Sequence, residues 1–256
     1  MDEEELCLIY IFSNKGDNPM NFSLKISSKI VGVLFIVAGV ASVIGLLLYD
    51  PILNGPDYLI RGSEHANKVR LGAIFELITV VTVVGTATTM FPILRKYNET
   101  IALWHLCFRF LEAIAITVGI ISVLSLLTLS QKFVSAGALD IASFQASGTL
   151  LKAIHDWTFL LGPNFMLGIN TMMCSYLLYR SKLIPRFISV MGLSGATLIF
   201  IASILEMFGI ILQLSIWGAV LAIPIALYEM TLAVWLIVKG FNVSAISYGK
   251  GNSYGQ

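Results

Sequence analysis

Six long runs of apolar residues alternate along the chain with short polar segments. A helix rises about 1.5 Å per residue, so about 20 apolar residues span the hydrocarbon core of a membrane. The polar segments between the runs leave too little chain for a soluble domain. The pattern therefore predicts an all-α integral membrane protein, a bundle of six transmembrane helices. The six runs are residues 30–48, 71–94, 101–129, 157–179, 187–212 and 216–238.

The remaining sequence divides the chain into three parts. Residues 1–28 begin with an acidic run and a short apolar stretch, without the basic leader of a signal peptide. We expect a cytoplasmic amino-terminal extension over 1–28, a six-helix transmembrane domain over 29–240 and a disordered cytoplasmic tail over 241–256. Met20 offers a second start, and we expect the first nineteen residues to lie outside the packed domain.

Lysine and arginine residues are unevenly shared between the two sides of the predicted bundle. Ten lie in segments on the side of both termini, and five lie in segments on the opposite side. Segments rich in these residues stay in the cytoplasm. We therefore expect a protein of the cell membrane that is surrounded by lipid and has both termini in the cytoplasm.

The composition agrees with a multi-pass membrane protein and excludes other classes. Of the 256 residues, 57% are hydrophobic and only 12% are charged. A net charge of +1, without a basic stripe, excludes nucleic acid as a partner. The three cysteines lack CxxC spacing, and no HExxH, GxSxG or phosphate-binding glycine motif occurs. The sequence therefore indicates no metal, no cofactor and no catalytic residue.

The third apolar run carries charges that belong on one face of a helix. Arg109 and Glu112 follow His105 at spacings of four and three residues. A charge at membrane depth needs a partner inside the bundle. Glu229, beside Tyr228 in the sixth run, has the same predicted depth as Arg109, so we expect Arg109 to pair with Glu229 and Glu112. Such a triad either fixes helix register or binds a ligand.

A second set of polar residues belongs nearer the opposite side of the membrane. Glu76 in the second run and Glu206 in the fifth have similar predicted depth, with His155 and Asp156 just above them. Acids at one level with little positive charge share protons or bind a cation. We expect these four residues to form part of a ligand or ion site.

Two further patterns bear on a polar interior. Threonines follow Glu76 at helical spacing, and they either bond their own backbone or line a hydrated path. The sequence Gly162-Pro163-Asn164 interrupts the fourth run, as in helices that line a cavity. Before that run, residues 140–154 predict a helix that lies over the outer surface.

Several local signatures resemble one family of prokaryotic multi-pass membrane proteins. They are DPILNGPDYL, RKYNE, FRFLEA, LSLLTLSQ, the DW that opens the fourth run, LLYRSKLIPR and IALYEMTLAVWLIVKGF. Together they resemble the domain of unknown function 4386 from about Met20 to Phe241. The resemblance implies a six-helix membrane protein and supplies no activity and no functional residue.

Three functional hypotheses follow. In the first, the protein binds or moves a small molecule, lipid or ion through a polar cavity in the bundle. In the second, it is a partner or regulatory subunit, or a homo-oligomer, and its charges only specify packing. In the third, it is a membrane enzyme acting on lipid head groups, with Glu112, Arg109 and Glu229 as acid, anion clamp and base. We favour the first hypothesis over the second and the second over the enzyme, which stays open as an alternative.

Overall fold

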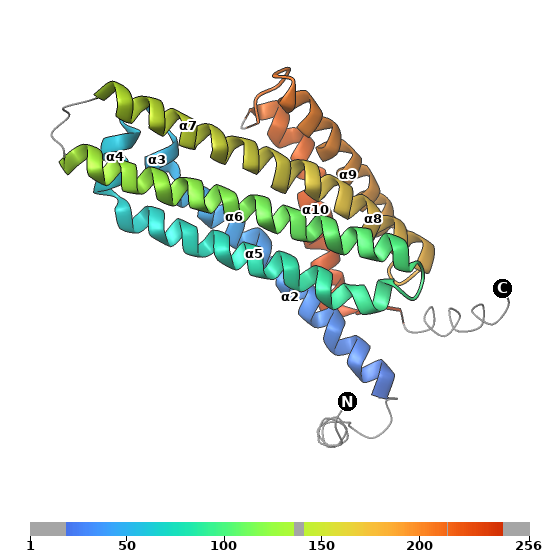
Figure 1. The fold of residues 1–256 in the computed structure, drawn as a ribbon. Helices are drawn as coiled ribbons and strands as arrows, with labels where there is room; N and C mark the ends of the chain where they lie inside the picture. The colour runs from blue at the N-terminus through green and yellow to red at the C-terminus, as the bar shows by residue number, and fades with distance from the viewer. Residues whose placement is uncertain (1–18, 136–140, 214, 243–256) are drawn as a thin grey trace.

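The computed structural model describes residues 19–135, 141–213 and 215–242. Within these ranges the chain is helical and contains no strand (Figure 1). The elements are α2 (Pro19–Leu48), α3 (Asp50–Leu53), α4 (Tyr58–Glu64), α5 (Ala66–Leu94), α6 (Glu99–Ser135), α7 (Ile141–Phe159), the π-helix η1 (Leu160–Met166), α8 (Leu167–Ser181), α9 (Arg186–Met207) and α10 (Ile216–Val238).

Five described helices are long and apolar enough to cross a membrane. Five of the six predicted runs therefore coincide with such a helix, and the all-helical class is confirmed. The helix of the fifth run, α9, ends at Met207, five residues before the predicted end of that run, because Gly209 turns the chain with φ +68°. The five spans are Ser23–Leu48, Ala66–Leu94, Glu99–Ser135, Arg186–Met207 and Ile216–Val238.

The fourth predicted run is divided among α7, η1 and α8. Pro163 has no backbone N–H, so the regular α-helical bonding pattern cannot continue through it. The chain instead widens into π-helical turns over Leu160–Met166 and resumes as α8. The predicted interruption is therefore a stretch of π-helix, and neither α-helical piece inside the run is long enough to span alone.

The helix before this run lies differently from our expectation. It begins at Ile141, but it runs along α6 instead of lying across the end of the bundle (Figure 1). Ser122 on α6 donates a hydrogen bond to the Leu151 carbonyl at 2.6 Å. Gly119 on α6 allows the close approach, since Thr158 Oγ1 lies 3.0 Å from where a methyl group would be. The helix and its continuation into the fourth run are confirmed, whereas the predicted position over the outer surface was wrong, because the helix packs along α6.

One end of the bundle holds the start of α2 and the end of α10. The Asn242 amide donates to the Leu183 carbonyl at 2.8 Å, which fastens the residues after α10 to the α8–α9 turn. Gly240 lies against Ser28 near the start of α2. The opposite end carries α3 and α4, which Ser130 of α6 joins by a hydrogen bond to the Leu59 carbonyl.

α6 is the longest helix, and its length exceeds the thickness of a membrane. Its 37 residues measure about 55 Å, whereas the hydrocarbon core is about 30 Å thick. At the α3–α4 end, α6 packs together with α7, α3 and α4 (Figure 1).

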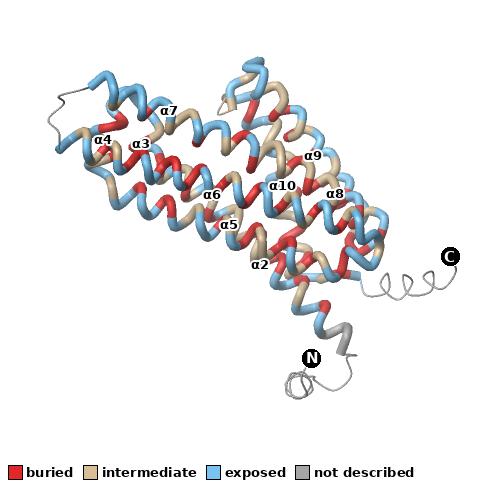
Figure 2. The backbone as a smooth tube through the Cα atoms, viewed as in Figure 1, coloured by how far each residue is buried: buried red, intermediate tan, exposed pale blue. Residues whose placement is uncertain are grey.

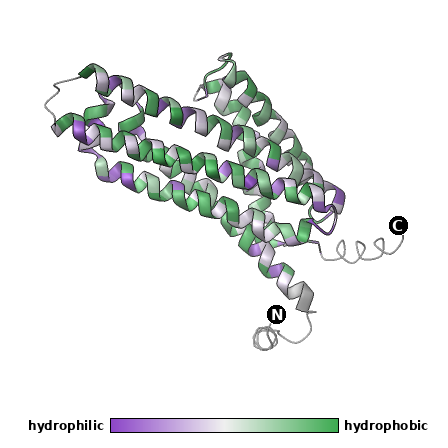
Figure 3. Cartoon of the chain, in the orientation of Figure 1, coloured by the Kyte–Doolittle hydropathy of each residue, from purple (hydrophilic) through white to green (hydrophobic). Residues whose placement is uncertain are grey.

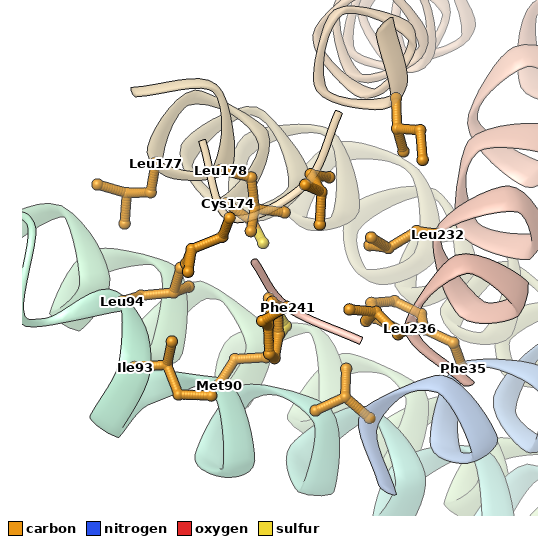
Figure 4. Packing of buried hydrophobic residues seen from close by; sticks show 14 of the residues in the cluster. Phe35, Met90, Ile93, Leu94, Cys174, Leu177, Leu178, Leu232, Leu236 and Phe241 are labelled. Carbon is orange, nitrogen blue, oxygen red and sulfur yellow. The ribbon is translucent and has the colours of Figure 1, made fainter. Parts of the chain in front are cut away.

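Two separate hydrophobic cores hold the bundle together. One lies at the α8–α9 end and includes Met90, Leu178, Leu236 and Phe241 (Figure 4). The other lies at the α3–α4 end around Tyr49. Buried and exposed positions alternate along the helices (Figure 2), and many large apolar residues are exposed. Hydrophobic residues predominate along the helices, and hydrophilic residues are frequent near their ends (Figure 3). Such an apolar exterior is suited to lipid.

Candidate functional site

A cavity of about 260 Å³ lies between the two hydrophobic cores. Side chains from α2, α5, α6, α10 and the π-helical region line it, and most of them are apolar. Four of the lining residues are ionisable, and all four were predicted from the sequence: Glu76, Arg109, Glu112 and Glu229. The apolar lining includes Phe35, Val83, Ile116 and Phe159.

Arg109 and Glu112 form a buried ion pair on one wall of this cavity. Arg109 Nη1 donates to both carboxylate oxygens of Glu112 at 3.0 Å, and both side chains are 4% exposed. Arg109 Nη2 lies 3.5 Å from Glu229 Oε1 on α10, and Glu229 is 19% exposed. The guanidinium also lies 5.7 Å from the ring centre of Phe35. The predicted partners of Arg109 are confirmed.

α8 completes the hydrogen bonding of Glu112. Asn170 Nδ2 donates to Glu112 Oε2 at 2.6 Å, and the Asn170 carbonyl bonds His105 Nδ1 at 3.0 Å. Gly162 lets the π-helix approach α6 beside Glu112, since a methyl group there would lie 2.8 Å from Ala115 Cβ. Both oxygens of Glu112 therefore accept hydrogen bonds from within the bundle, from α6 and from α8.

Glu76 faces the same cavity but is held differently. Its carboxylate has no ion pair and no hydrogen bond within the described residues. Gly45 on α2 makes room for it, because a methyl group at position 45 would lie 2.5 Å from Glu76 Oε1. A half-buried carboxylate without a partner is costly at membrane depth, and a proton or a bound cation would neutralise it.

A smaller cavity of about 20 Å³ adjoins Glu76 and is large enough for one water molecule. Tyr49 and His155 also line it, and their rings meet edge to face with centroids 6.1 Å apart. Burial, and secondarily the Glu76 carboxylate, raise the pKa of Tyr49 above its usual value, so Tyr49 is a neutral phenol. Its hydroxyl has no partner among the described residues. Four polar side chains, including that of Thr158, thus surround one water-sized space.

The other acids of the predicted outer set lie elsewhere. Asp156 is 66% exposed, and its Oδ1 lies 3.3 Å from His155 Nδ1. Glu206 on α9 accepts a hydrogen bond from Asn164 Nδ2 at 2.9 Å. Neither lines either cavity. In the part of the chain that the structure describes, no three His, Cys, Asp or Glu side chains converge as metal ligands. Glu76 and His155 come together, whereas Glu206 and Asp156 face other neighbours.

The threonines of α5 satisfy their own helix. Thr79, Thr82 and Thr86 each donate to a backbone carbonyl three or four residues earlier, at 2.7 to 3.2 Å. Of these, only Thr79 lines the larger cavity. Tyr228 is buried in the hydrophobic core near the α8–α9 end, where its hydroxyl accepts a hydrogen bond from Ser175 at 3.0 Å. These contacts favour a packing role for the threonines and for Tyr228.

Three polar residues of this region were not among the predicted site residues. Asn170 links Glu112 to His105, Asn164 binds Glu206, and Tyr49 faces Glu76. The available signal was an amide within an apolar run, since such a side chain needs a partner as a charge does. Asn164 and Asn170 both follow Pro163 in the interrupted run, so the interruption marked the segment that supplies these partners.

The comparisons with known proteins place the chain in one family. A search of curated proteins and a search of solved structures each returned no match. The family model for a domain of unknown function, DUF4386, matches residues 30–240. This match covers the bundle from α2 to the end of α10, including every residue that lines the two central cavities. The chain therefore belongs to the DUF4386 family, as the resemblance implied.

Proposed function

We propose that this protein is a six-span protein of a prokaryotic cell membrane, with both termini in the cytoplasm, that binds a small cationic molecule or ion in its central cavity and moves it through the bundle. One observation carries this proposal: the unpaired Glu76 carboxylate faces a mostly apolar cavity inside a membrane bundle. A ligand with a positive charge and an apolar body would match both features.

The charges around the cavity favour a cation over an anion. Three carboxylates line the cavity, against the single cation of Arg109. The charge of Arg109 is already balanced by Glu112 and Glu229, which lie 3.0 and 3.5 Å from its guanidinium, and this disfavours an anionic ligand. The paired residues hold the helices in register, and Glu76 supplies the charge that a ligand would neutralise.

Six passages and a common side for both termini are supported by the arrangement of the helices. α7, η1 and α8 follow one another without a break, and together they run alongside α6 (Figure 1). The start of α2 and the end of α10 lie at the same end of the bundle. An even number of passages requires this arrangement, and the excess of Lys and Arg at that end favours the cytoplasm.

The test uses two probes of the same shape and different charge. Benzyltrimethylammonium is a permanent cation, and neopentylbenzene is its neutral isostere. Of the two probes, we expect only benzyltrimethylammonium to raise the unfolding temperature of the purified protein. Glu76→Gln removes the charge without removing a described hydrogen bond, so it should fold normally and lose the response. Glu99→Gln changes an exposed acid outside the cavity and should keep it.

Native mass spectrometry of the same three proteins supplies a second measurement. A cation that copurifies with the wild type and with Glu99→Gln, and is missing from Glu76→Gln, supports the proposal. The proposal is overturned if Glu76→Gln responds to benzyltrimethylammonium as the wild type does. It is also overturned if the wild type is unliganded and responds equally to both probes.

A further inference from the structure

Another cavity, separate from the two central ones, lies at the α8–α9 end of the bundle, far from Glu76 along the helices. It has a volume of about 500 Å³ and is formed by the α8–α9 turn and the residues that follow α10. Three basic side chains line it: Lys182, Arg186 and Lys239. No acid lines it among the described residues. The central cavity shares none of these residues, so this site stands independently of the function proposed above.

The fold brings the three cations together from segments distant in sequence. The Asn242 amide donates to the Leu183 carbonyl at 2.8 Å, which holds the end of α10 against the α8–α9 turn. Phe241 is buried in the nearby hydrophobic core and anchors this extension (Figure 4). Gly240, with φ +72°, makes the bend that places Phe241 inward. The cavity is thus a built feature of two fastened segments.

The three cations have little to neutralise them. None forms an ion pair with a carboxylate in the described part of the chain. The guanidinium of Arg186 lies 5.4 Å from the ring centre of Tyr179, a contact that leaves its N–H groups available. Like charges repel one another, so a group of three that share one cavity is suited to an anion.

The position of the cavity identifies the kind of anion. α8 and α9 meet here, and α10 ends here, so the cavity lies where apolar helices reach the membrane surface. Trp235 is half-buried in its wall, and tryptophan is typical of the level of lipid head groups. Leu183 and Ile184 supply an apolar floor. A phosphate on a glycerol backbone fits such a basic rim and apolar floor.

We infer that this cavity binds the phosphate head group of an anionic phospholipid. Lys182, Arg186 and Lys239 would bind the phosphate, and Trp235 would contact the glycerol region. Arg186 can donate two parallel hydrogen bonds to phosphate oxygens, whereas the lysines act as point charges. The bound lipid would join the α8–α9 turn to the end of α10.

The test measures lipid binding by native mass spectrometry on delipidated protein in detergent. Phosphatidylglycerol, phosphatidylcholine and inorganic phosphate are the three probes. We expect phosphatidylglycerol to bind with preference over phosphatidylcholine, and millimolar phosphate to leave it bound. The triple variant Lys182→Asn, Arg186→Gln and Lys239→Gln should weaken phosphatidylglycerol binding roughly a hundredfold, because each basic residue near an anionic lipid contributes roughly fivefold. Asparagine is chosen at position 182 because it tolerates the φ of +55° there.

The control changes two cations at the same end of the bundle. Arg95 and Lys96 lie at the α5–α6 turn and outside this cavity, so Arg95→Gln with Lys96→Gln should weaken binding less than twofold. Arg186→Lys, made alone, retains the charge and should keep most of the affinity. Equal losses in the triple and control variants would overturn the inference, and so would equal binding of the two lipids. If free phosphate displaced the lipid, the cavity would be a general anion site instead of a lipid site, and the inference would be overturned.

Discussion

The central cavity has two charged walls, and the two are held in opposite ways. On the α6 wall, Glu112 accepts hydrogen bonds from Arg109 and Asn170, and Glu229 contacts the same guanidinium. On the α5 wall, Glu76 has no described partner. Charges that neutralise one another hold helices together, whereas an unpaired charge needs a partner from elsewhere. The comparison therefore separates the residues that are paired within the bundle from Glu76, the residue that we propose to bind a cation.

On the α6 wall, the largest expected effect comes from Arg109→Ala. The substitution leaves Glu112 and Glu229 buried without their cation, so we expect a loss of about 3–5 kcal/mol in unfolding free energy. Thermal and denaturant unfolding in mild detergent would measure it. Lys68→Ala removes one exposed positive charge outside the cavity and should change stability little. A stable Arg109→Ala protein would show that the wall does not hold the bundle.

The two partners of Arg109 should differ from each other. Glu112→Gln weakens three charge-assisted hydrogen bonds in a buried site, and we expect a loss of about 1.5–3 kcal/mol. Glu229→Gln affects one 3.5 Å contact of a partly exposed group, and we expect a loss of about 1 kcal/mol or less. Unfolding free energies of the two variants, measured side by side, test the difference. Equal losses would contradict the assigned geometry.

Gly45→Ala tests the α5 wall, which carries Glu76, without changing a charge. The added methyl group would lie 2.5 Å from Glu76 Oε1, so the carboxylate has to move away from its place in the cavity. We expect a stability loss of about 1–3 kcal/mol and weaker response to benzyltrimethylammonium. Gly85→Ala is the matched control, since its methyl group meets only the flexible end of Leu34. A normal cation response in Gly45→Ala would show that the Glu76 position is not critical.

The smallest effect concerns an exposed carboxylate outside the membrane-spanning segments. A hydrogen bond from Asn54 at 3.1 Å, followed by the charge of Arg61, lowers the pKa of Asp50. A lowered pKa favours the folded state above the ordinary pKa, and this contribution is lost as pH falls. Asn54→Ala should return the pKa toward its ordinary value, which NMR titration of the Asp50 carboxyl would detect. An unchanged titration would show that Arg61 alone sets it.

Much of this arrangement follows from the sequence alone. Counting residues from the ends of apolar runs gave the depth of Arg109 and Glu229 correctly enough to predict their contact, because a helix has a constant rise. The need to neutralise a buried charge then left few candidates for a partner. Pro163 likewise predicted an interruption, since its missing N–H acts in any helix.

The direction in which each side chain points was harder to predict. Glu76 and Glu206 have similar predicted depth, yet one faces the central cavity and the other faces Asn164. Depth comes from a single helix, whereas direction depends on which helices are neighbours. The path of α7 depended on the same information, because its packing along α6 rests on contacts such as Ser122 with the Leu151 carbonyl. Asn170 was missed because its partners lie on another helix.

The π-helix between α7 and α8 also sets the rotational phase of everything that follows it. A π-helical turn holds an extra residue compared with an α-helical turn, so it acts like an insertion that the helix absorbs without a loop. Deleting one residue from Leu160–Met166 would restore α-helical spacing and rotate α8 by about 100° relative to α7. Asn170 would then turn away from Glu112 and His105. A gain or loss of one residue in η1 would therefore change which side chains of α8 face the cavity.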